Sequence, residues 1–494
     1  MQGLVKRLLF GGIAGKVLGV LRELVAAWCF GTGLVANAYR LAQAAFLLPL
    51  HGFVSDVVNG AFTPHYARLR VADPAQAQIL FLATQRLLLG AGIFAAAGLM
   101  IWGQWLVALM APGFSAEARK LTTELVTVLA LALPAYVVVG LYGATELVHG
   151  QGRLVAARAS IQSCGLLVGT MAAWIWHYPL LIAVGFVASY VVLFFWSISI
   201  NRSLGVKMTG QIGSFRAWTD ALTPIAKVFL VLMWVPLSLQ VSQIVERRIA
   251  SALDQNAVAA LDYARFITET LLIVIAMPFG VAGQAAMPTM NEQEFRREAQ
   301  RSVRLLVMVG LPLATFIWSQ AQAIVVLLFK RGAFNADSVN VTASILGANA
   351  LGVAFLLVAY AGQKFLNARG RNLVVLRSTL AGVAVSVICN LGLSTAFGVS
   401  VLGVAAAASG FVVMISVLLA LDLLRPVWLQ TWTLWLTALC HLAVVVVVRA
   451  SWVSIWWVEL IVGMLVWMIA LTAVPAQRAI VVQALGLLRR KGNK

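Results

Sequence analysis

Two full charges interrupt an apolar stretch near the start of the chain, GVLRELVAAWCFGTG at residues 19–33. Arg22 carries a full positive charge, and Glu23 follows it with the opposite charge. The pair predicts a role at a cleft inside the protein. The alternative is that both side chains neutralise neighbours or reach toward an interface.

Composition indicates that these charges lie in a membrane. Of the 494 residues, 62% are hydrophobic and 11% are charged, whereas soluble domains average about 45–50% and about 25%. Apolar segments long enough to cross a bilayer recur along the whole chain. We predict an all-α polytopic membrane protein with about fourteen transmembrane helices, at approximate residues 8–29, 35–63, 78–110, 121–148, 155–177, 179–200, 222–248, 256–287, 303–329, 339–365, 374–396, 401–422, 430–449 and 453–473.

Charges at membrane depth are candidates for function, because they are unfavourable unless they face a cavity or a partner. Gly11, Gly15 and Gly19 predict a close-packing face on the first helix, with Arg22 and Glu23 beyond it on the same inward side. Lys16 and Lys227 lie nearer predicted helix ends, where long side chains reach the interface.

Further charges lie in the predicted second and eighth helices. Arg40 lies in the second. Asp262, Arg265 and Glu269 lie in the eighth, at spacings that place them on one helix face. These three side chains either face the cleft or pair with one another in a ladder.

The sequence offers no catalytic or metal-binding set. The five histidines are dispersed, and the four cysteines are scattered within predicted spans. Neither a GxxxxGK[ST] loop nor a GxSxG motif occurs. We therefore expect a transporter rather than an enzyme, with no resident cofactor and no metal site.

The net charge of +19 is explained by topology. Most Lys and Arg residues fall at helix ends and in loops on one side, which predicts that both termini are cytoplasmic. This distribution indicates contact with anionic membrane lipids and argues against a nucleic-acid partner.

The chain contains an internal repeat. Residues 26–39 align with 250–263, and GFSAEARKLT (113–122) aligns with AFNADSVNVT (333–342). GQGRLVAAR (150–158) further aligns with ARGRNLVVL (368–376). Six predicted helices separate the copies, so the repeat is parallel. We predict an N-lobe at 1–215, a C-lobe at 216–425, and two additional helices with a basic cytoplasmic tail at 426–494.

Several of these stretches resemble the MviN/MurJ family of lipid-linked glycan flippases, in the superfamily that also contains the MATE exporters. The most specific is LFKRGAFNADSVNVT, followed by GKVLGVLRELVAAWCFGTG and its downstream ANAY. PTMNEQEFRREAQRSVRLLVMVGLP and NLGLSTAFGVSVLGVAAAAS continue the pattern, so that the resemblance covers roughly residues 5–425.

The resemblance implies fourteen helices in two lobes, a cationic central cavity and a hydrophobic groove from the last two helices. Its members carry undecaprenyl-pyrophosphate-linked saccharides across the bacterial inner membrane. Arg22 matches the helix-1 arginine of the family, Glu23 replaces its usual Asp, and Arg265 lies within a residue of its helix-8 arginine. With the charges above, the expected substrate-binding residues are Arg22, Glu23, Asn37, Arg40, Arg265 and Glu269.

Two departures from the family pattern leave the cargo open. Asn37 stands where lipid II flippases usually have Asp, and an arginine pair late in helix 2 is missing from LLPLHGFVSDVVNGAF. Arg40, one turn after Asn37, is the nearest replacement for that charge. Both lipid II for peptidoglycan and an exopolysaccharide or O-antigen repeat unit therefore remain as cargoes.

Energy coupling and partners follow from the resemblance as well. Glu246 and Asn390 lie close to positions where the family can hold a cation, which predicts coupling to Na⁺ or to the membrane potential. Arg247 and Arg248 beside Glu246 favour the alternative that it pairs with them. A glycan polymerase or glycosyltransferase complex is the expected protein partner.

Two other functions compete with this one. A cation-coupled multidrug exporter of the MATE type would favour an acidic cavity, and Arg22 and Arg40 argue against it. A membrane scaffold for a glycan polymerase would leave the buried charges unexplained.

Overall fold

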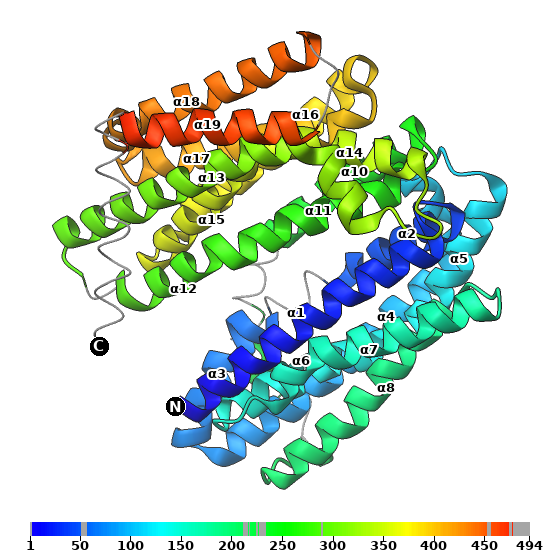
Figure 1. Ribbon diagram of the computed structural model, residues 1–494. Helices are drawn as coiled ribbons and strands as arrows, with labels where there is room; N and C mark the ends of the chain where they lie inside the picture. Colours follow the sequence, from blue (N-terminus) through cyan, green and yellow to red (C-terminus); the bar gives the residue numbers. More distant parts are fainter. Residues whose placement is uncertain are drawn as a thin grey trace. The chain divides into compact units, whose positions relative to one another are not determined.

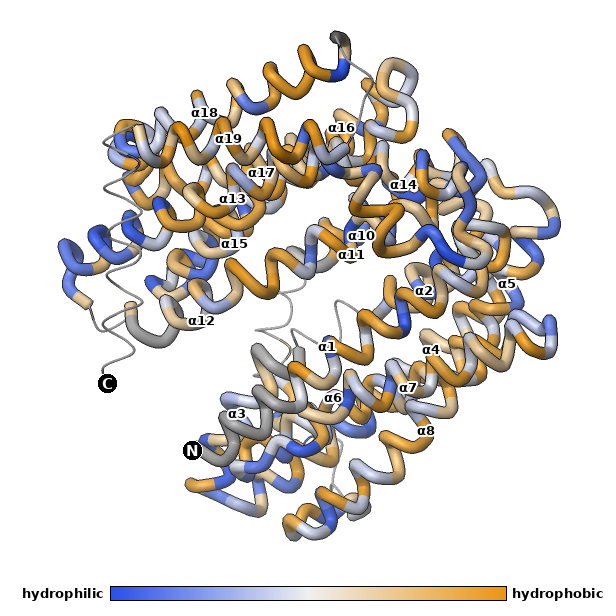
Figure 2. The backbone as a smooth tube through the Cα atoms, in the orientation of Figure 1, coloured by the Kyte–Doolittle hydropathy of each residue, from blue (hydrophilic) through white to orange (hydrophobic). Residues whose placement is uncertain are grey.

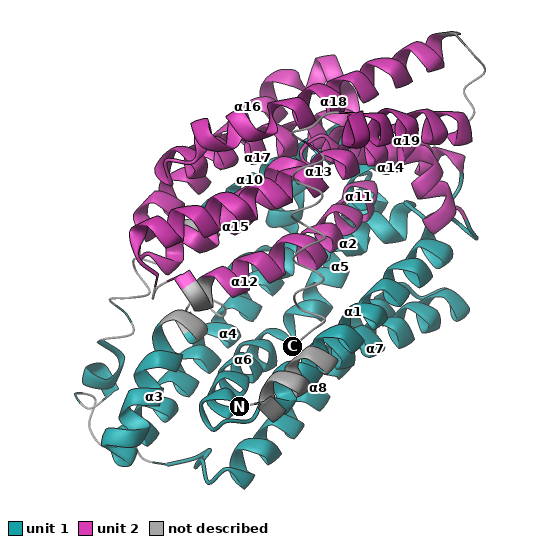
Figure 3. Ribbon diagram, turned by 60° about the vertical axis from the view of Figure 1, so that its left-hand side comes forward, with its two compact units in different colours: residues 1–259, 331–335 teal, residues 260–330, 336–494 magenta. Residues whose placement is uncertain are grey.

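The computed structural model describes residues 2–50, 57–210, 216, 218–223, 226, 234–287, 290–451, 456–473 and 477. Regular structure in these ranges is helical, without a β-strand, which confirms the predicted all-α class. Two compact units are formed, residues 1–259 with 331–335 and residues 260–330 with 336–494 (Figure 3). These units follow packing, whereas the lobes at 1–215, 216–425 and 426–494 follow the sequence repeat and stay a prediction. The basic tail beyond residue 477 lies outside the described residues.

The first unit is a bundle of helices from the N-terminal half of the chain (Figure 1). Its elements are α1 (Gln2–Phe30), α2 (Leu34–Leu50), the π-helix η2 (Val57–Phe62), α3 (Thr63–Ala72), α4 (Pro74–Met110), α5 (Ala116–Ala130), α6 (Leu133–Val148), α7 (Arg153–Ile175), α8 (Leu180–Ser203) and α10 (Trp234–Leu253).

The second unit begins within α11 (Ala257–Leu271), whose first turn still belongs to the first unit. Its further elements are the π-helix η3 (Leu272–Ala276), α12 (Met277–Ala286), α13 (Glu292–Phe329), α14 (Ala336–Ala350), α15 (Val353–Ala368), α16 (Asn372–Phe397), the 3₁₀ turn η5 (Gly398–Ser400), α17 (Val401–Ala420), α18 (Leu424–Ser451) and α19 (Trp456–Ala473).

Within the described residues, each predicted span coincides with a helix or with consecutive helical pieces. Seven described helices are long and apolar enough to cross a membrane, or up to nine when each bent pair counts as one span. This number takes residues 372–420 as one helix. Gly382 of α16 nevertheless packs against Ser409 and Val413 of α17, so the chain folds back on itself at Gly398. Figure 2 shows hydrophobic residues along most of the helices.

Two predicted helices are bent pairs instead of continuous spans. The segment at 121–148 is α5 and α6, bent by 45°, and the segment at 339–365 is α14 and α15, bent by 54°. Pro134 in the first turn of α6 has no N–H to continue the helix across the first break. Gly352 lies at the second break, where α15 begins.

The two bent pairs also end alike. Gly150 after α6 and Gly370 after α15 have positive φ, 76° and 69°. The next N–H donates back to a carbonyl five residues earlier, Gln151 to Glu146 at 3.1 Å and Arg371 to Leu366 at 2.9 Å. This is the Schellman arrangement, which satisfies the last carbonyls of a helix. The same arrangement ends both bent pairs, although Gly370 aligns in the sequence with Gly152, two residues after Gly150.

Helix α1 packs closely on α7 through small residues. A Cβ atom on Gly11 would clash with Ala156, and one on Gly15 would clash with Ala159. The predicted close-packing face is therefore present at these two positions. The prediction was wrong for Gly19, because a Cβ there would meet nothing within 4 Å among the described residues.

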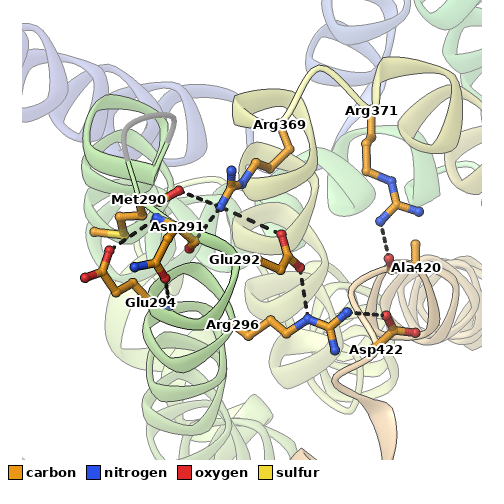
Figure 4. A network of polar contacts seen from close by, with 9 residues as sticks. All are labelled: Met290, Asn291, Glu292, Glu294, Arg296, Arg369, Arg371, Ala420 and Asp422. Atoms are coloured by element: carbon orange, nitrogen blue, oxygen red, sulfur yellow. Dashed lines mark hydrogen bonds and ion pairs between the residues drawn. The ribbon is translucent and has the colours of Figure 1, made fainter.

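Polar contacts tie together three chain turns of the second unit (Figure 4). Asn291 and Glu294 form a capping box that starts α13. Arg296 in the same turn bonds Glu292 and Asp422, each at 2.9 Å. Contacts to the backbone complete the network, from Arg369 to Met290 at 3.1 Å and from Arg371 to Ala420 at 2.5 Å.

The loop 331–335 belongs to the first unit although the helices on both sides of it belong to the second. The Ala333 N–H donates to the Trp28 carbonyl at the end of α1, at 2.9 Å. A Cβ atom on Gly332 would overlap that same carbonyl oxygen, and one on Gly31 would overlap the carbonyl of Ala333. Both glycines also have positive φ, 57° and 56°. Only glycine permits this approach.

The equivalent loop of the other repeat copy makes a reciprocal contact. Gly113 lies so close to the end of α10 that a Cβ atom would overlap the Ser251 carbonyl. Arg248 of α10 adds a hydrogen bond of 3.0 Å to the Leu109 carbonyl. Each of the two repeat-related loops thus packs on the end of the first helix of the other copy.

We predict that Gly332→Ala lowers the unfolding temperature of the purified protein more than Gly370→Ala does. Both glycines have positive φ, which costs an alanine about 1–2 kcal/mol. Only at Gly332 does the added methyl also meet a carbonyl, whereas a Cβ on Gly370 meets nothing within 4 Å. Thermal unfolding in detergent measures the difference, for which we expect about 1–3 kcal/mol more from overpacking. Equal shifts for the two variants would show that the close approach is unimportant.

Candidate functional site

One carboxylate in the first unit is shared between two arginines. Glu23 Oε1 accepts from Arg22 Nη2 at 2.6 Å and from Arg22 Nε at 3.2 Å. Arg40, on α2, donates to both carboxylate oxygens, Nη2 to Oε2 and Nη1 to Oε1 at 3.4 Å. The structure therefore brings together three of the predicted site residues, and it adds the α1–α2 pairing that sequence reasoning did not contain.

The three side chains are buried unevenly. Their relative exposure is 4% for Glu23, 10% for Arg40 and 23% for Arg22. The formal charges of these three residues alone sum to +1, and Arg22 is the most accessible of them. The Tyr39 hydroxyl, one residue before Arg40, is buried without a hydrogen-bond partner among the described residues. An anion with several acceptor oxygens suits this arrangement.

Asn37 forms hydrogen bonds to backbone groups near this site. Its amide nitrogen donates to the Thr32 carbonyl and, at 3.0 Å, to the Gly33 carbonyl, in the turn between α1 and α2. Its Oδ1 accepts from the Ala259 N–H at 2.7 Å, in the first turn of α11. That N–H has no partner within its own helix, so Asn37 acts as an N-cap from another element. A carboxylate here could accept from Ala259 but could not donate to the two carbonyls.

The other two expected substrate-binding residues lie on α11. Arg265 is half-buried and Glu269 is exposed, both in the second unit. That these two residues line one cavity with Arg22 stays a prediction.

The expected cation site is divided between the units in the same way. Glu246 on α10 is 4% exposed and belongs to the first unit. Asn390 on α16 is fully buried in the second. The Asn390 amide nitrogen donates to the Ser386 carbonyl at 2.9 Å, while its Oδ1 has no hydrogen-bond partner in the described part of the chain. Cation coupling through these two residues stays a prediction.

Two buried polar groups of the first unit were missed by sequence reasoning. Glu146 is completely buried and accepts from the backbone N–H groups of Arg153 and Leu154, each at 2.8 Å, which caps the start of α7. The guanidinium of Arg158 lies 4.5 Å from the ring centre of Tyr136, as a cation–π contact, and Nε bonds the Tyr190 hydroxyl at 3.3 Å. The position of Glu146 four residues before the GQGR stretch could have indicated the first of these groups.

Comparisons with known proteins show the family of this chain. The family model described as "Lipid II flippase MurJ" matches residues 26–474. The probable lipid II flippase MurJ of Rhizobium meliloti (strain 1021) is 27% identical over 426 residues, which is 80% of this chain and 75% of that protein.

Two solved structures share the fold. A lipid II flippase MurJ in an inward closed conformation superposes with a TM-score of 0.79 at 16% identity, covering 94% of this chain and 98% of that one. An inward-facing MATE multidrug transporter gives a TM-score of 0.68 at 17% identity, covering 85% and 97%.

We predict that Glu23→Gln destabilises the protein more than either Arg22→Ala or Arg40→Ala. Loss of the carboxylate removes one counter-ion from two guanidiniums at once, and breaking a buried ion pair on one side costs about 3–5 kcal/mol. Loss of one arginine leaves the carboxylate paired with the other. Thermal unfolding and membrane yield measure the order of the three variants.

The double variant Glu23→Gln/Arg40→Gln provides the control, because it removes one charge of each sign. It should regain a large part of the stability lost in Glu23→Gln. An equally unstable double variant would mean that charge balance does not govern this site.

Proposed function

The chain belongs to the MurJ family of lipid flippases, and from this premise we propose that it moves an undecaprenyl-pyrophosphate-linked saccharide across the bacterial inner membrane by alternating access. The observation that carries the proposal is the buried carboxylate of Glu23 shared by Arg22 and Arg40. The likeness to MATE transporters concerns the fold alone.

The shared carboxylate makes a reversible anion site. A diphosphate brings several acceptor oxygens, which compete with Glu23 for the N–H donors of Arg22. Because Glu23 keeps its bonds to Arg40, release of Arg22 does not leave the carboxylate unpaired. When the diphosphate departs, Glu23 takes back Arg22. The site thus exchanges one anion for another without exposing a bare charge to hydrocarbon.

We assign the remaining residues supporting roles. Asn37 positions the turn after α1 through its backbone contacts. Arg265 and Glu269 are proposed to contribute a second charged face to the cavity. Orientation with both termini cytoplasmic follows the excess of basic residues on one side, and reporter fusions after residues 33 and 72 should report opposite sides. A glycan polymerase or glycosyltransferase complex stays the predicted partner.

Two cargo classes fit the site. Lipid II is favoured by the family match. An exopolysaccharide or O-antigen repeat unit is favoured by Asn37 in place of the usual Asp and by the missing arginine pair in residues 47–62, of which 51–56 lie outside the described residues. Both cargoes present the same diphosphate to Arg22.

We further propose that the membrane potential or a sodium gradient drives the cycle, with Glu246 and Asn390 as the cation-binding residues. One charge moved through 100 mV is worth about 2.3 kcal/mol, enough to bias a two-state carrier. Flipping in proteoliposomes should fall severalfold when the gradient that drives it is collapsed. Transport that is indifferent to both potential and sodium would rule the coupling out.

Arg22 should be required for transport itself. Arg22→Ala should abolish complementation of a flippase-deficient strain, and Arg22→Lys should impair it, because lysine keeps the charge and loses the planar fork. Both variants should reach the membrane at normal levels, since Glu23 retains Arg40.

The assay uses one strain that lacks its lipid II flippase and another that lacks its O-antigen flippase, so that the rescued strain identifies the cargo. Full complementation by Arg22→Ala would reduce the Arg22–Glu23–Arg40 cluster to a structural role.

A further inference from the structure

A large cavity lies within the second unit, away from the residues discussed above. Its volume is about 1530 Å³, whereas small-molecule sites usually enclose about 300–1,000 Å³. Residues of α13, α14 and α19 line it, together with the turn between α16 and α17 and the last turns of α18. Most of its wall is aliphatic or aromatic, so its occupant must have a long apolar body.

One polar side chain in this wall lacks its partners. Gln320 of α13 is 7% exposed, and neither its amide nitrogen nor its amide oxygen has a hydrogen-bond partner among the described residues. A buried amide left unpaired costs about 1–3 kcal/mol. A ligand that offers both an acceptor and a donor would remove that cost.

A charged pair, Arg449 and Glu459, also lines the cavity. Arg449 bonds Glu459 through Nε at 3.0 Å and Nη2 at 2.8 Å, and Nη2 also donates to the carbonyl of Ser319, the neighbour of Gln320. The guanidinium lies 5.0 Å from the ring centre of Trp318. Nη1 makes no hydrogen bond within the described residues, and the Arg449 side chain is 39% exposed.

The rim of the cavity is apolar and open. Leu327 is 72% exposed, Trp456 58% and Met464 53%. In a membrane protein, such side chains face lipid chains rather than water. The natural source of the occupant is therefore the bilayer itself.

We propose that this cavity binds one diacyl phospholipid of the surrounding membrane. Its acyl chains lie along the aliphatic walls, and its ester carbonyls accept from the Gln320 amide nitrogen. Its phosphate accepts from Arg449 Nη1, and the hydroxyl or ammonium of its headgroup donates to the Gln320 amide oxygen. Glu459 already neutralises Arg449, so the site selects by hydrogen bonding more than by net charge. A polyprenyl phosphate has no ester carbonyl and fits Gln320 less well.

The test uses the full chain in detergent, with palmitoyl-oleoyl phosphatidylglycerol, palmitoyl-oleoyl phosphatidylethanolamine and undecaprenyl phosphate as separate probes. Native mass spectrometry measures the lipid retained, and thermal unfolding measures the stabilisation that each probe gives. We expect one phospholipid per chain, of either headgroup. Transport is not a readout, so the outcome is independent of the proposed flipping activity.

Two variants and a control locate the site. Gln320→Leu removes the unpaired amide, so the protein should fold normally and hold phospholipid about tenfold more weakly, equivalent to about 1.4 kcal/mol. Ala343→Trp on α14 places a bulky indole in the cavity and should weaken retention. Gln293→Leu makes the same amide-to-leucine change at an exposed position in the first turn of α13 and should retain lipid as the unaltered chain does. Phospholipid retention unchanged in Gln320→Leu, or retention of undecaprenyl phosphate alone, would overturn the proposal.

Discussion

A carboxylate that is removed from water needs donors to replace the water, and in hydrocarbon it finds them only within the protein. Four glutamates of the described residues are less than 5% exposed, and three of them meet that constraint in three different ways. Glu146 takes two backbone N–H groups at the start of α7, and Glu459 takes two donors from the single guanidinium of Arg449. Glu23 alone of these three is divided between two arginines.

Because their partners differ, the three glutamates differ in whether they can release one partner and stay paired. Glu146 is fixed by backbone, and its release would uncap a helix. Glu459 and Arg449 balance each other in net charge, although Arg449 Nη1 makes no hydrogen bond within the described residues. Glu23 has two arginine partners in the described part of the chain, so it can release one while it keeps the other. Burial and pairing are common to all three glutamates, and what distinguishes Glu23 is its second arginine partner.

Backbone groups obey the same constraint, and this explains the glycines and the bent helices. Where α5 and α14 break off, a second helix restarts within a few residues, and both bent pairs end in the arrangement that satisfies their last carbonyls. Where loops meet helix ends, Gly31, Gly113 and Gly332 bring backbone against backbone without an intervening side chain. The two copies of the repeat share these backbone contacts, although few of their aligned residues are identical.

The sequence is sufficient for features that depend on composition or on one helix, and insufficient for those that join distant residues. Spans, the Gly11–Gly15 face and the position of Arg22, Glu23 and Arg40 within apolar helices could all be predicted, because hydropathy and burial cost act locally. The shared Glu23 could not, since it requires the relative placement of α1 and α2. Arg22 and Glu23 are neighbours whose side chains leave the helix in different directions, yet both are long enough to meet.

Asn37 illustrates the harder case. Its partner Ala259 lies 222 residues further along the chain, and no local pattern indicates that an amide in one helix caps another. The bonds also give the departure from Asp a physical meaning. An amide donates to two carbonyls and accepts from one N–H, whereas a carboxylate only accepts. The amide of Asn37 thus bonds three backbone groups around the turn that follows α1, while the formal charges of the neighbouring cluster come from Arg22, Glu23 and Arg40.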